Sequence, residues 1–107
     1  MPVSEFMLPS GPGFDRVHIS VIRFIEVNDK QCRVVTNDKE YLMTTSLRWF
    51  ESSLPETQFA RIHRRYLVGI RHINSVGEDG LAVGKKELPV SRRLRPALIR
   101  KLTGSNR

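Results

Sequence analysis

The sequence has few of the residues that would support a disulfide, a metal site or a membrane anchor. Its one cysteine, Cys32, cannot form an internal disulfide, and one thiol with three scattered histidines is not a zinc-binding framework. The sequence has no run of 18 apolar residues, and the N-terminus lacks a basic segment followed by an apolar one. We therefore expect a soluble, cytoplasmic protein with no cofactor and no membrane insertion.

Signatures of enzymes are also scarce. The segments "GPG" and "GEDG" lack the spacing and the strand-to-helix context of a phosphate-binding loop. No pair of carboxylates lies near the basic segments in sequence to support acid–base or two-metal chemistry. His63 lies among arginines and could act as the base of a small nuclease, but a hydrogen bond to a phosphate or a strand is the simpler role. We expect that the protein is not an enzyme.

Negative charge is scarce in the second half of the chain. Residues 1–53 contain six Lys or Arg and seven Asp or Glu, a net charge of −1, whereas residues 54–107 contain twelve and four, a net charge of +8. Thirteen of the eighteen basic residues are arginine, whose planar fork suits phosphates and guanine edges better than lysine does. A pI of about 10.3 and this asymmetry favour nucleic acid or another acidic partner.

The segment "FARIHRRYLVGI" (59–70) combines large apolar residues with Arg61, His63, Arg64 and Arg65. A strand buried on both faces gains nothing from these charges, and a solvated strand would not contain so many large hydrophobic residues. The pattern indicates a segment that is half buried in a core and half in contact with a negatively charged partner.

Two further segments have similar chemistry. Arg92 and Arg93 follow Ser91 in "VSRRLRP", where a strand is predicted to end, and "NDKQCR" (28–33) lies between two predicted strands. A solvated charge run and an ordinary hairpin turn are the simpler interpretations of these two segments. From its neighbours alone, Cys32 is expected to be a buried or half-buried small apolar residue rather than a redox sensor.

The pattern of the chain predicts one mostly β domain, since 107 residues leave little room for a second. Residues 1–13, rich in proline and glycine, are predicted to form a flexible leader before a domain at 14–107. Short strands are predicted through most of that domain, with one short helix at about 46–53 that Ser46 caps. A C-terminal helix is predicted at about 94–102, with Pro96 in its first turn. The aromatic side chains Phe24, Trp49, Phe50 and Phe59 are expected in the core.

The strings "FARIHRRYLVGIRHINSV" and "LAVGKKELPVSRRLRPALIRKL" closely resemble the LytTR family of bacterial DNA-binding domains. That family has an F-x-R-[IV]-H-[RK]-[SR]-Y-L-V-N segment and a later l-P-V-S-R-R segment. Earlier parts of the chain are similar to the family's opening strands and to its S-L-x-x-[LF]-e-x-x-L-P helix, so the resemblance covers residues 15–102. It implies an elongated fold of short antiparallel sheets whose loops enter successive major grooves on one side of duplex DNA.

The resemblance also implies which residues contact DNA. They lie in the loop after the first glutamate-bearing strand, in the I-H-[RK] stretch and in the S-R-R loop: Lys30, Gln31, Cys32, His63, Arg64, Arg65, Arg92 and Arg93. The chain departs from the family pattern at Gly69, where relatives have asparagine, and at Gln31 and Cys32, which puts the base preference of that loop in doubt. Many relatives also have a receiver domain, for which this chain has no room, so dimerisation driven by phosphorylation is not implied.

Together these observations predict a sequence-specific transcription regulator that binds double-stranded DNA, with two copies on repeated sites. Arg64 and Arg93 are the best candidates for contacts to base edges. Arg61, Lys85 and Lys86 are predicted to contact phosphates, as are Arg65 and Arg92. A regulatory protein partner is a further possibility. The alternatives are an RNA-binding module, which would need more exposed aromatic side chains, and a basic module that binds an acidic protein.

Overall fold

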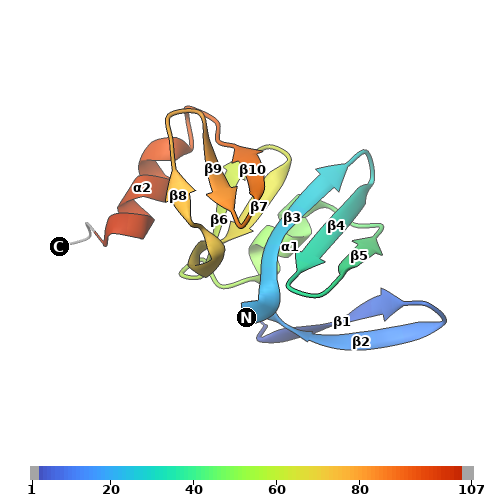
Figure 1. Cartoon of the computed structure of the whole chain (residues 1–107). Coiled ribbons are helices and arrows are strands. Elements are labelled where there is room, and N and C mark those ends of the chain that lie inside the picture. The colour runs from blue at the N-terminus through green and yellow to red at the C-terminus, as the bar shows by residue number, and fades with distance from the viewer. Residues whose placement is uncertain (1–2, 105–107) are drawn as a thin grey trace.

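The computed structural model describes residues 3–104 and contains three antiparallel sheets with two α-helices (Figure 1). The strands are β1 (Glu5–Ser10), β2 (Gly13–His18), β3 (Ile22–Asn28), β4 (Gln31–Thr36), β5 (Glu40–Met43), β6 (Phe59–His63), β7 (Tyr66–Gly69), β8 (Ser75–Val76), β9 (Gly80–Val83) and β10 (Lys86–Pro89). The α-helices are α1 (Leu47–Ser53) and α2 (Arg95–Thr103), and two short 3-10 turns are η1 (Ile19–Val21) and η2 (Ile70–His72). The predicted mostly β fold with two helices is confirmed.

The sheets are arranged along an elongated body of 44 × 26 × 23 Å. A central five-stranded sheet has the order β5-β4-β3-β7-β6, a two-stranded sheet is the β1–β2 hairpin, and a three-stranded sheet has the order β10-β9-β8. In the part of the chain that the structure describes, neither α-helix is long and apolar enough to cross a membrane. The hairpin lies at one side of the body, and β8–β10 with α2 lie at one end (Figure 1).

The central sheet has a hydrophobic core on each face, because its strands alternate between the two. Ile25 and Leu67 point into a cluster that the hairpin and α1 complete, whereas Phe24 and Val68 point into a cluster that β8–β10 and α2 complete. Successive residues of a strand point to opposite faces, so each short apolar strand supplies both cores. This explains why the strand sequences contain runs of apolar residues rather than strict alternation.

Helix α1 forms as predicted. The Ser46 hydroxyl accepts a hydrogen bond from Trp49 N at 3.0 Å, and Leu47, Phe50 and Leu54 are all buried. The helix ends before Pro55. Trp49 differs from the prediction, because its side chain is 44% exposed even though its ring packs against Phe50 with 5.1 Å between centroids.

Helix α2 also begins where the position of Pro96 predicts. Leu94 is its N-cap and Pro96 lies in its first turn, where the missing N–H costs nothing. Gly104 ends the helix in the left-handed conformation, with φ of 63°. The Lys101 Nζ donates hydrogen bonds to the carbonyls of Glu56 and Phe59, and so fastens the helix to the start of β6.

The prediction of a flexible leader at 1–13 is wrong for the residues that the structure describes, and residues 1 and 2 lie outside them. Strand β1 buries Phe6 and Leu8 against the central sheet. The Asp15 carboxylate of β2 accepts hydrogen bonds from Tyr41 at 2.8 Å and from Lys39 at 2.9 Å. The proline and glycine residues that suggested mobility instead form the turn of a hairpin and its edge.

Gly69 is required by a close approach of two backbones. A Cβ atom at this position would lie 2.6 Å from the Ile22 carbonyl oxygen. We therefore expect Gly69→Asn, which restores the family pattern, to lower the free energy of unfolding by about 1–3 kcal/mol because β3 and β7 must separate. Urea denaturation followed by circular dichroism would measure the change. Gly13→Asn is the matched control, since no atom lies within 4 Å of the corresponding Cβ and little change is expected.

Candidate nucleic-acid interface

Three loops lie along one long edge of the molecule. They are the β3–β4 turn at 29–30, the β6–β7 turn at 64–65 and the loop at 91–94 between β10 and α2, and we call this surface the loop edge. All three are at the upper side of the molecule in Figure 1, away from the β1–β2 hairpin. The three segments that sequence reasoning singled out are therefore neighbours in the fold.

Backbone hydrogen bonds join the three loops. Val27 N, near the end of β3, donates to the Arg65 carbonyl at 2.9 Å, and Ser91 N donates to the Ile62 carbonyl at 2.8 Å. The β6–β7 turn is thus the middle element, connected to β3 on one side and to the start of the third loop on the other. Because each bond ties a loop residue to a residue of a strand in the central sheet, the spacing between the loops is set by the fold.

The Arg61 side chain stabilises the β6–β7 turn through hydrogen bonds to backbone carbonyls. Its Nε donates to the His63 carbonyl at 2.8 Å, Nη2 donates to the Arg64 carbonyl at 2.7 Å, and Nη1 pairs with Glu51 at 2.7 Å. Its side chain is only 24% exposed. The guanidinium that we predicted to contact phosphate thus serves first to hold the turn, and a phosphate contact from Arg61 stays a prediction.

The geometry of His63 determines its tautomer. Its Nδ1 accepts a hydrogen bond from Arg65 N at 3.1 Å, so in the neutral ring the proton lies on Nε2. Partial burial lowers the pKa of His63, and the positive charges of Arg64, Arg65 and Arg61 lower it further. His63 is therefore neutral near pH 7 and offers an Nε2–H donor, which suits an acceptor such as a phosphate or the O6 and N7 atoms of guanine.

Glu26 anchors the β6–β7 turn to the central sheet. Its carboxylate accepts hydrogen bonds from Arg33 and, at 2.9 Å, from the Tyr66 hydroxyl, and lies 3.7 Å from Arg65. Arg65 Nε also donates to the Val27 carbonyl at 3.1 Å. Burial alone would raise the pKa of Glu26, but the hydrogen bonds from Arg33 and Tyr66 and the two positive charges hold it below its ordinary value.

The lowered pKa of Glu26 predicts a loss of stability in acid. Its contribution to stability is fully present above the pKa of an unfolded glutamate, about 4.3, and is lost as the pH falls through the lower pKa of the folded state. We expect Glu26→Gln to reduce stability at neutral pH and to flatten the fall in unfolding free energy below about pH 4.3. Urea titrations at a series of pH values would measure this. An equally steep acid dependence in the variant would contradict it, and Glu56→Gln serves as the control because Glu56 is exposed.

Cys32 is buried, as expected from its neighbours, so its side chain is not exposed on the surface of the β3–β4 turn, and the predicted DNA contact of this residue stays a prediction. Cys32 is fully buried, and its Sγ donates to the Thr45 carbonyl at 3.3 Å. Burial raises the pKa of the thiol, although the charge of Arg61 acts in the opposite direction. Lys30 and Gln31 remain exposed at the tip of the turn. Within residues 3–104, no three His, Cys, Asp or Glu side chains lie close enough together to hold a metal ion.

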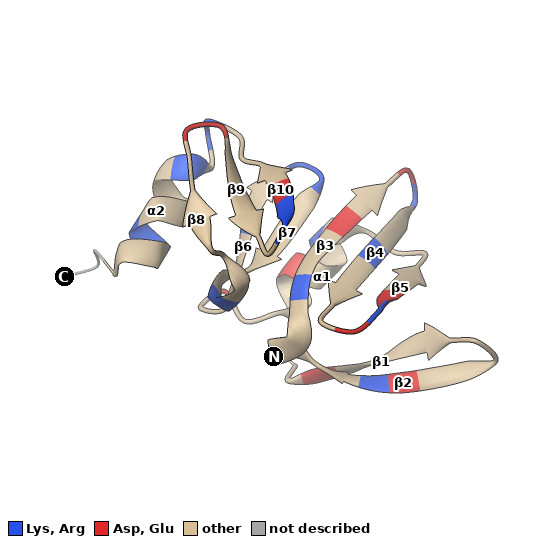
Figure 2. Ribbon diagram, viewed as in Figure 1, with Lys and Arg blue, Asp and Glu red and all other residues tan. Residues whose placement is uncertain are grey.

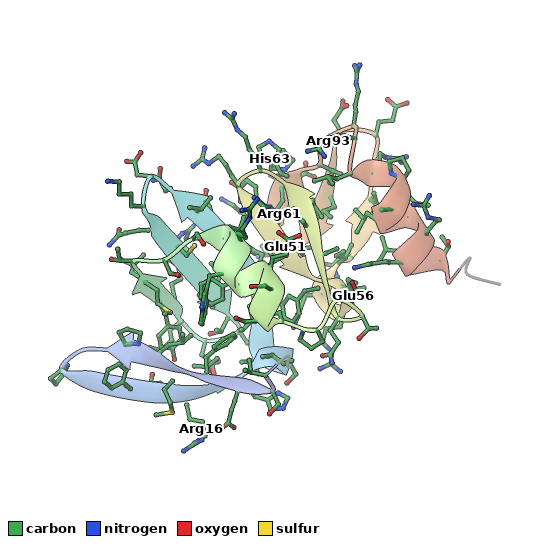
Figure 3. All side chains as sticks on the ribbon, turned by 180° about the vertical axis from the view of Figure 1, so that it is seen from behind. Arg16, Glu51, Glu56, Arg61, His63 and Arg93 are labelled. Atoms are coloured by element: carbon green, nitrogen blue, oxygen red, sulfur yellow. The ribbon has the colours of Figure 1, made fainter. Side chains whose placement is uncertain are left out.

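The third loop is held by Ser91. The Ser91 hydroxyl accepts a hydrogen bond from Leu94 N at 3.3 Å, while its carbonyl accepts from Leu94 N and Arg95 N at 3.1 Å each. Arg92 and Arg93 are exposed at the tip of this loop. In Figure 3, Arg93 and His63 project from the same edge of the molecule, as the sequence prediction requires.

A groove lies between the first two loops, and it contains a basic residue that sequence reasoning missed. Arg48, in the first turn of α1, lines it together with Lys30, Arg61, Arg64 and the acidic Asp29. In the sequence, nothing but its charge marked Arg48 as a candidate. Its place beside Lys30 depends on how α1 packs, which the sequence does not show. The groove offers a concave basic surface in line with the loop edge.

Lys85 and Lys86 do not lie at the loop edge. They line a second groove with Arg23 and Arg33, between the central sheet and the β9–β10 turn. Gly84 allows this arrangement, since its positive φ of 61° and lack of a side chain leave room for the Arg23 guanidinium. The structure does not bring these two lysines to the loop edge, and their contact with phosphate stays a prediction.

The basic side chains at the tips of the loops have no carboxylate partner among the described residues. No carboxylate of residues 3–104 lies within 4 Å of Lys30, Arg64, Arg92 or Arg93. Figure 2 shows basic residues on each of the three loops, with the acidic residues of the β3–β4 and β8–β9 turns beside them. Unpaired arginines on exposed tips are available to an anionic partner.

Comparison with known proteins agrees with this geometry. The family model for the LytTr DNA-binding domain matches residues 14–103. A solved structure, the LytTr DNA-binding domain of a Bacillus cereus protein described as a methyl-accepting/DNA response regulator, is 29% identical in sequence. It superposes with a TM-score of 0.83, over 95% of this chain and 98% of that chain. A search of curated proteins gave no match. Since the family model covers most of the chain, this protein belongs to the LytTR family of DNA-binding domains.

Proposed function

We propose that this chain is a sequence-specific transcription regulator that inserts its three loops into successive major grooves of duplex DNA. The observation that carries the proposal is the loop edge, where Lys30, Arg64 and Arg93 stand on adjacent loops without a carboxylate partner among the described residues. We also propose that two copies of the chain bind to repeated sites on the DNA.

The dimensions of the molecule support this arrangement. Its longest extent is 44 Å, which exceeds the rise of one turn of B-form DNA, about 34 Å. The major groove, about 12 Å wide, admits a two-stranded turn such as β6–β7. The molecule as a whole is therefore longer than the distance between successive major grooves on one side of the duplex, as the proposed arrangement requires.

The basic residues of the loops make two kinds of contact with DNA, to base edges and to phosphates. Arg64 lies at the tip of the β6–β7 turn with only its carbonyl engaged, so its guanidinium can form a bidentate contact with guanine O6 and N7. Arg93 has the equivalent freedom in the third loop. Arg92 and the half-exposed Arg65 suit phosphate oxygens, which position the protein without reading sequence.

The test is selection from a pool of random duplexes at two salt concentrations, followed by sequencing. We expect enrichment of a short motif that occurs twice in each selected duplex, and loss of that enrichment in Arg64→Ala. Binding with a steep salt dependence and no enriched motif would contradict sequence-specific recognition. The same protein tested against acidic peptides and single-stranded RNA would then show which anionic partner the basic surface prefers.

Arg92→Ala separates phosphate contacts from base contacts. If Arg92 neutralises one phosphate, the slope of log K against log salt becomes less steep by roughly 0.9, and affinity falls to a similar degree for every sequence. Fluorescence anisotropy with selected and scrambled duplexes at several salt concentrations would measure this. Arg71→Ala is the matched control. Arg71 is exposed and lies in η2, which follows β7 on the side away from the β6–β7 turn. An unchanged slope in Arg92→Ala would exclude the contact.

A further inference from the structure

A second group of basic side chains lines the groove between the central sheet and the β9–β10 turn, which we call the basic groove. Arg23 of β3 and Arg33 of β4 contribute one wall, and Lys85 of the turn and Lys86 of β10 contribute the other. Figure 2 shows a basic segment on each of β3, β4 and β10. None of the described residues that line this groove belongs to the loop edge. The four cations therefore form a site of their own, which the binding of DNA at the three loops does not explain.

Most of this positive charge has no carboxylate partner. Arg33 pairs with Glu26 and, at 2.9 Å, with Glu40, so its charge is matched within the chain. Glu40 is the one carboxylate among the described residues that line the basic groove. No carboxylate of residues 3–104 lies within 4 Å of the other three basic side chains. Three like charges that face one groove repel one another, and an anion bound between them removes that repulsion.

The β9–β10 turn is shaped to receive the Arg23 guanidinium. Gly84, the residue before Lys85, has a positive φ of 61°, and a Cβ atom there would overlap the end of the Arg23 side chain. The half-buried guanidinium therefore lies against the turn, beside the lysines of the opposite wall. The floor of the groove is apolar, since Phe24 and Val83 line it and are buried. Charges above an apolar floor are screened less by water and attract an anion more strongly.

The number of cations indicates the chemistry of the ligand. A carboxylate has one negative charge and two oxygens, whereas a phosphate monoester has a charge of about −1.5 to −2 and three acceptor oxygens. The guanidinium fork binds two phosphate oxygens side by side, and the two ammonium groups act as point charges on the rest of the group. The groove volume of 360 Å³ lies within the range of small-molecule sites, about 300–1,000 Å³. The groove therefore has room for an organic group attached to the phosphate.

We propose that the basic groove binds a phosphate group, which Arg23 holds from the sheet and Lys85 and Lys86 hold from the other wall. A free phosphorylated small molecule and the backbone of a duplex both supply this group. The place of the groove outside the loop edge favours the free compound, because a duplex that lies along the three loops is bound by other residues. Binding at the groove does not rest on the proposed recognition of DNA sequence, so the two are tested separately.

The first test is a titration of pyrophosphate into the isotopically labelled full chain, at an ionic strength held constant with sodium chloride. The amide NMR signals of Gly84, Lys85 and Lys86 report on the groove itself, and we expect them to shift to saturation in the wild type. Arg23→Gln and the double variant Lys85→Gln/Lys86→Gln should each raise the dissociation constant about tenfold or more, because each removes charge-assisted hydrogen bonds. Wild-type signals that do not shift to saturation overturn the proposal.

Two controls separate a phosphate site from a general effect of charge. Arg71→Gln/Arg100→Gln removes the same charge as the lysine double variant, from exposed positions outside the groove, and should leave the dissociation constant unchanged. An equal loss of affinity in this control overturns the proposal. Malonate tests the class of ligand, and an affinity equal to that of pyrophosphate overturns the choice of phosphate. Circular dichroism identifies a variant that does not fold. Because Lys85 and Lys86 are exposed, their double variant keeps the test decisive even if Arg23→Gln unfolds.

The salt dependence of duplex binding distinguishes the two sources of phosphate. If the ligand is a free compound, Lys85→Gln/Lys86→Gln should bind duplex DNA with an unchanged slope of log K against log salt. A slope less steep by roughly 0.9 for each lost contact would assign the groove to the DNA backbone and overturn the free compound as its ligand. A chain that binds pyrophosphate in the groove but enriches no motif from random duplexes contradicts the proposed function alone. A chain that enriches a motif but shows no saturable shift at the groove contradicts this inference alone.

Discussion

Replacing Arg64 and Arg93 together with alanine is expected to abolish sequence discrimination while leaving residual binding to any duplex. Each bidentate contact to a base is worth about 1–3 kcal/mol, a factor of roughly 5 to 150 in affinity. The two residues lie on different loops, so their effects should add to about 2–6 kcal/mol. The backbone carbonyl of Arg64 accepts the Arg61 bond, and alanine retains that carbonyl, so the turn itself should survive.

Anisotropy titrations with the selected duplex and with single-base variants would measure this loss. The single variants should each relax base preference at a different position of the motif, because the proposed arrangement places the two loops in different major grooves. Arg71→Ala and Arg100→Ala remove the same charge from exposed sites outside the three loops and should leave discrimination unchanged. Equal weakening of specific and non-specific binding by Arg64→Ala would assign this residue to phosphate instead.

Ile62→Ala is expected to cause the largest loss of stability among the changes at the interface. Ile62 is fully buried in the core between the central sheet, β8–β10 and α2, and removing its side chain leaves a cavity. Such truncations cost about 2–5 kcal/mol, a large part of the total stability of a domain of this size. The Ile62 carbonyl also accepts the hydrogen bond from Ser91, so the cavity lies directly beneath the junction of two loops.

The change in unfolding free energy would be measured by urea denaturation, and DNA affinity by anisotropy at a temperature where the variant is folded. We expect reduced affinity even in the folded variant, because the spacing between the second and third loops depends on this contact. Ile99→Ala is the control, since Ile99 on α2 is only half buried and should cost less than about 1 kcal/mol. A loss for Ile62→Ala as small as the loss for Ile99→Ala would contradict the assigned role.

The sequence by itself determined the class of the fold and singled out three candidate loops. Apolar strands broken by turn residues predicted a mostly β domain, Ser46 predicted the start of α1, and Pro96 predicted the start of α2. These features depend on local physics, since capping and proline geometry act within one helical turn. The excess of basic residues in the second half and the family motifs together predicted DNA as the partner.

Only the tertiary structure decided which side chains are free to act. The family resemblance implied a DNA contact for Cys32 and the sequence suggested a phosphate contact for Arg61, but Cys32 is buried and Arg61 holds the β6–β7 turn. The leader became a hairpin because Phe6 and Leu8 find a core that residues far along the chain provide. The approach of Arg48 to Lys30, and the position of Lys85 and Lys86 away from the loop edge, likewise depend on packing. Burial and neighbouring charge are set by contacts between distant segments, and sequence spacing does not contain them.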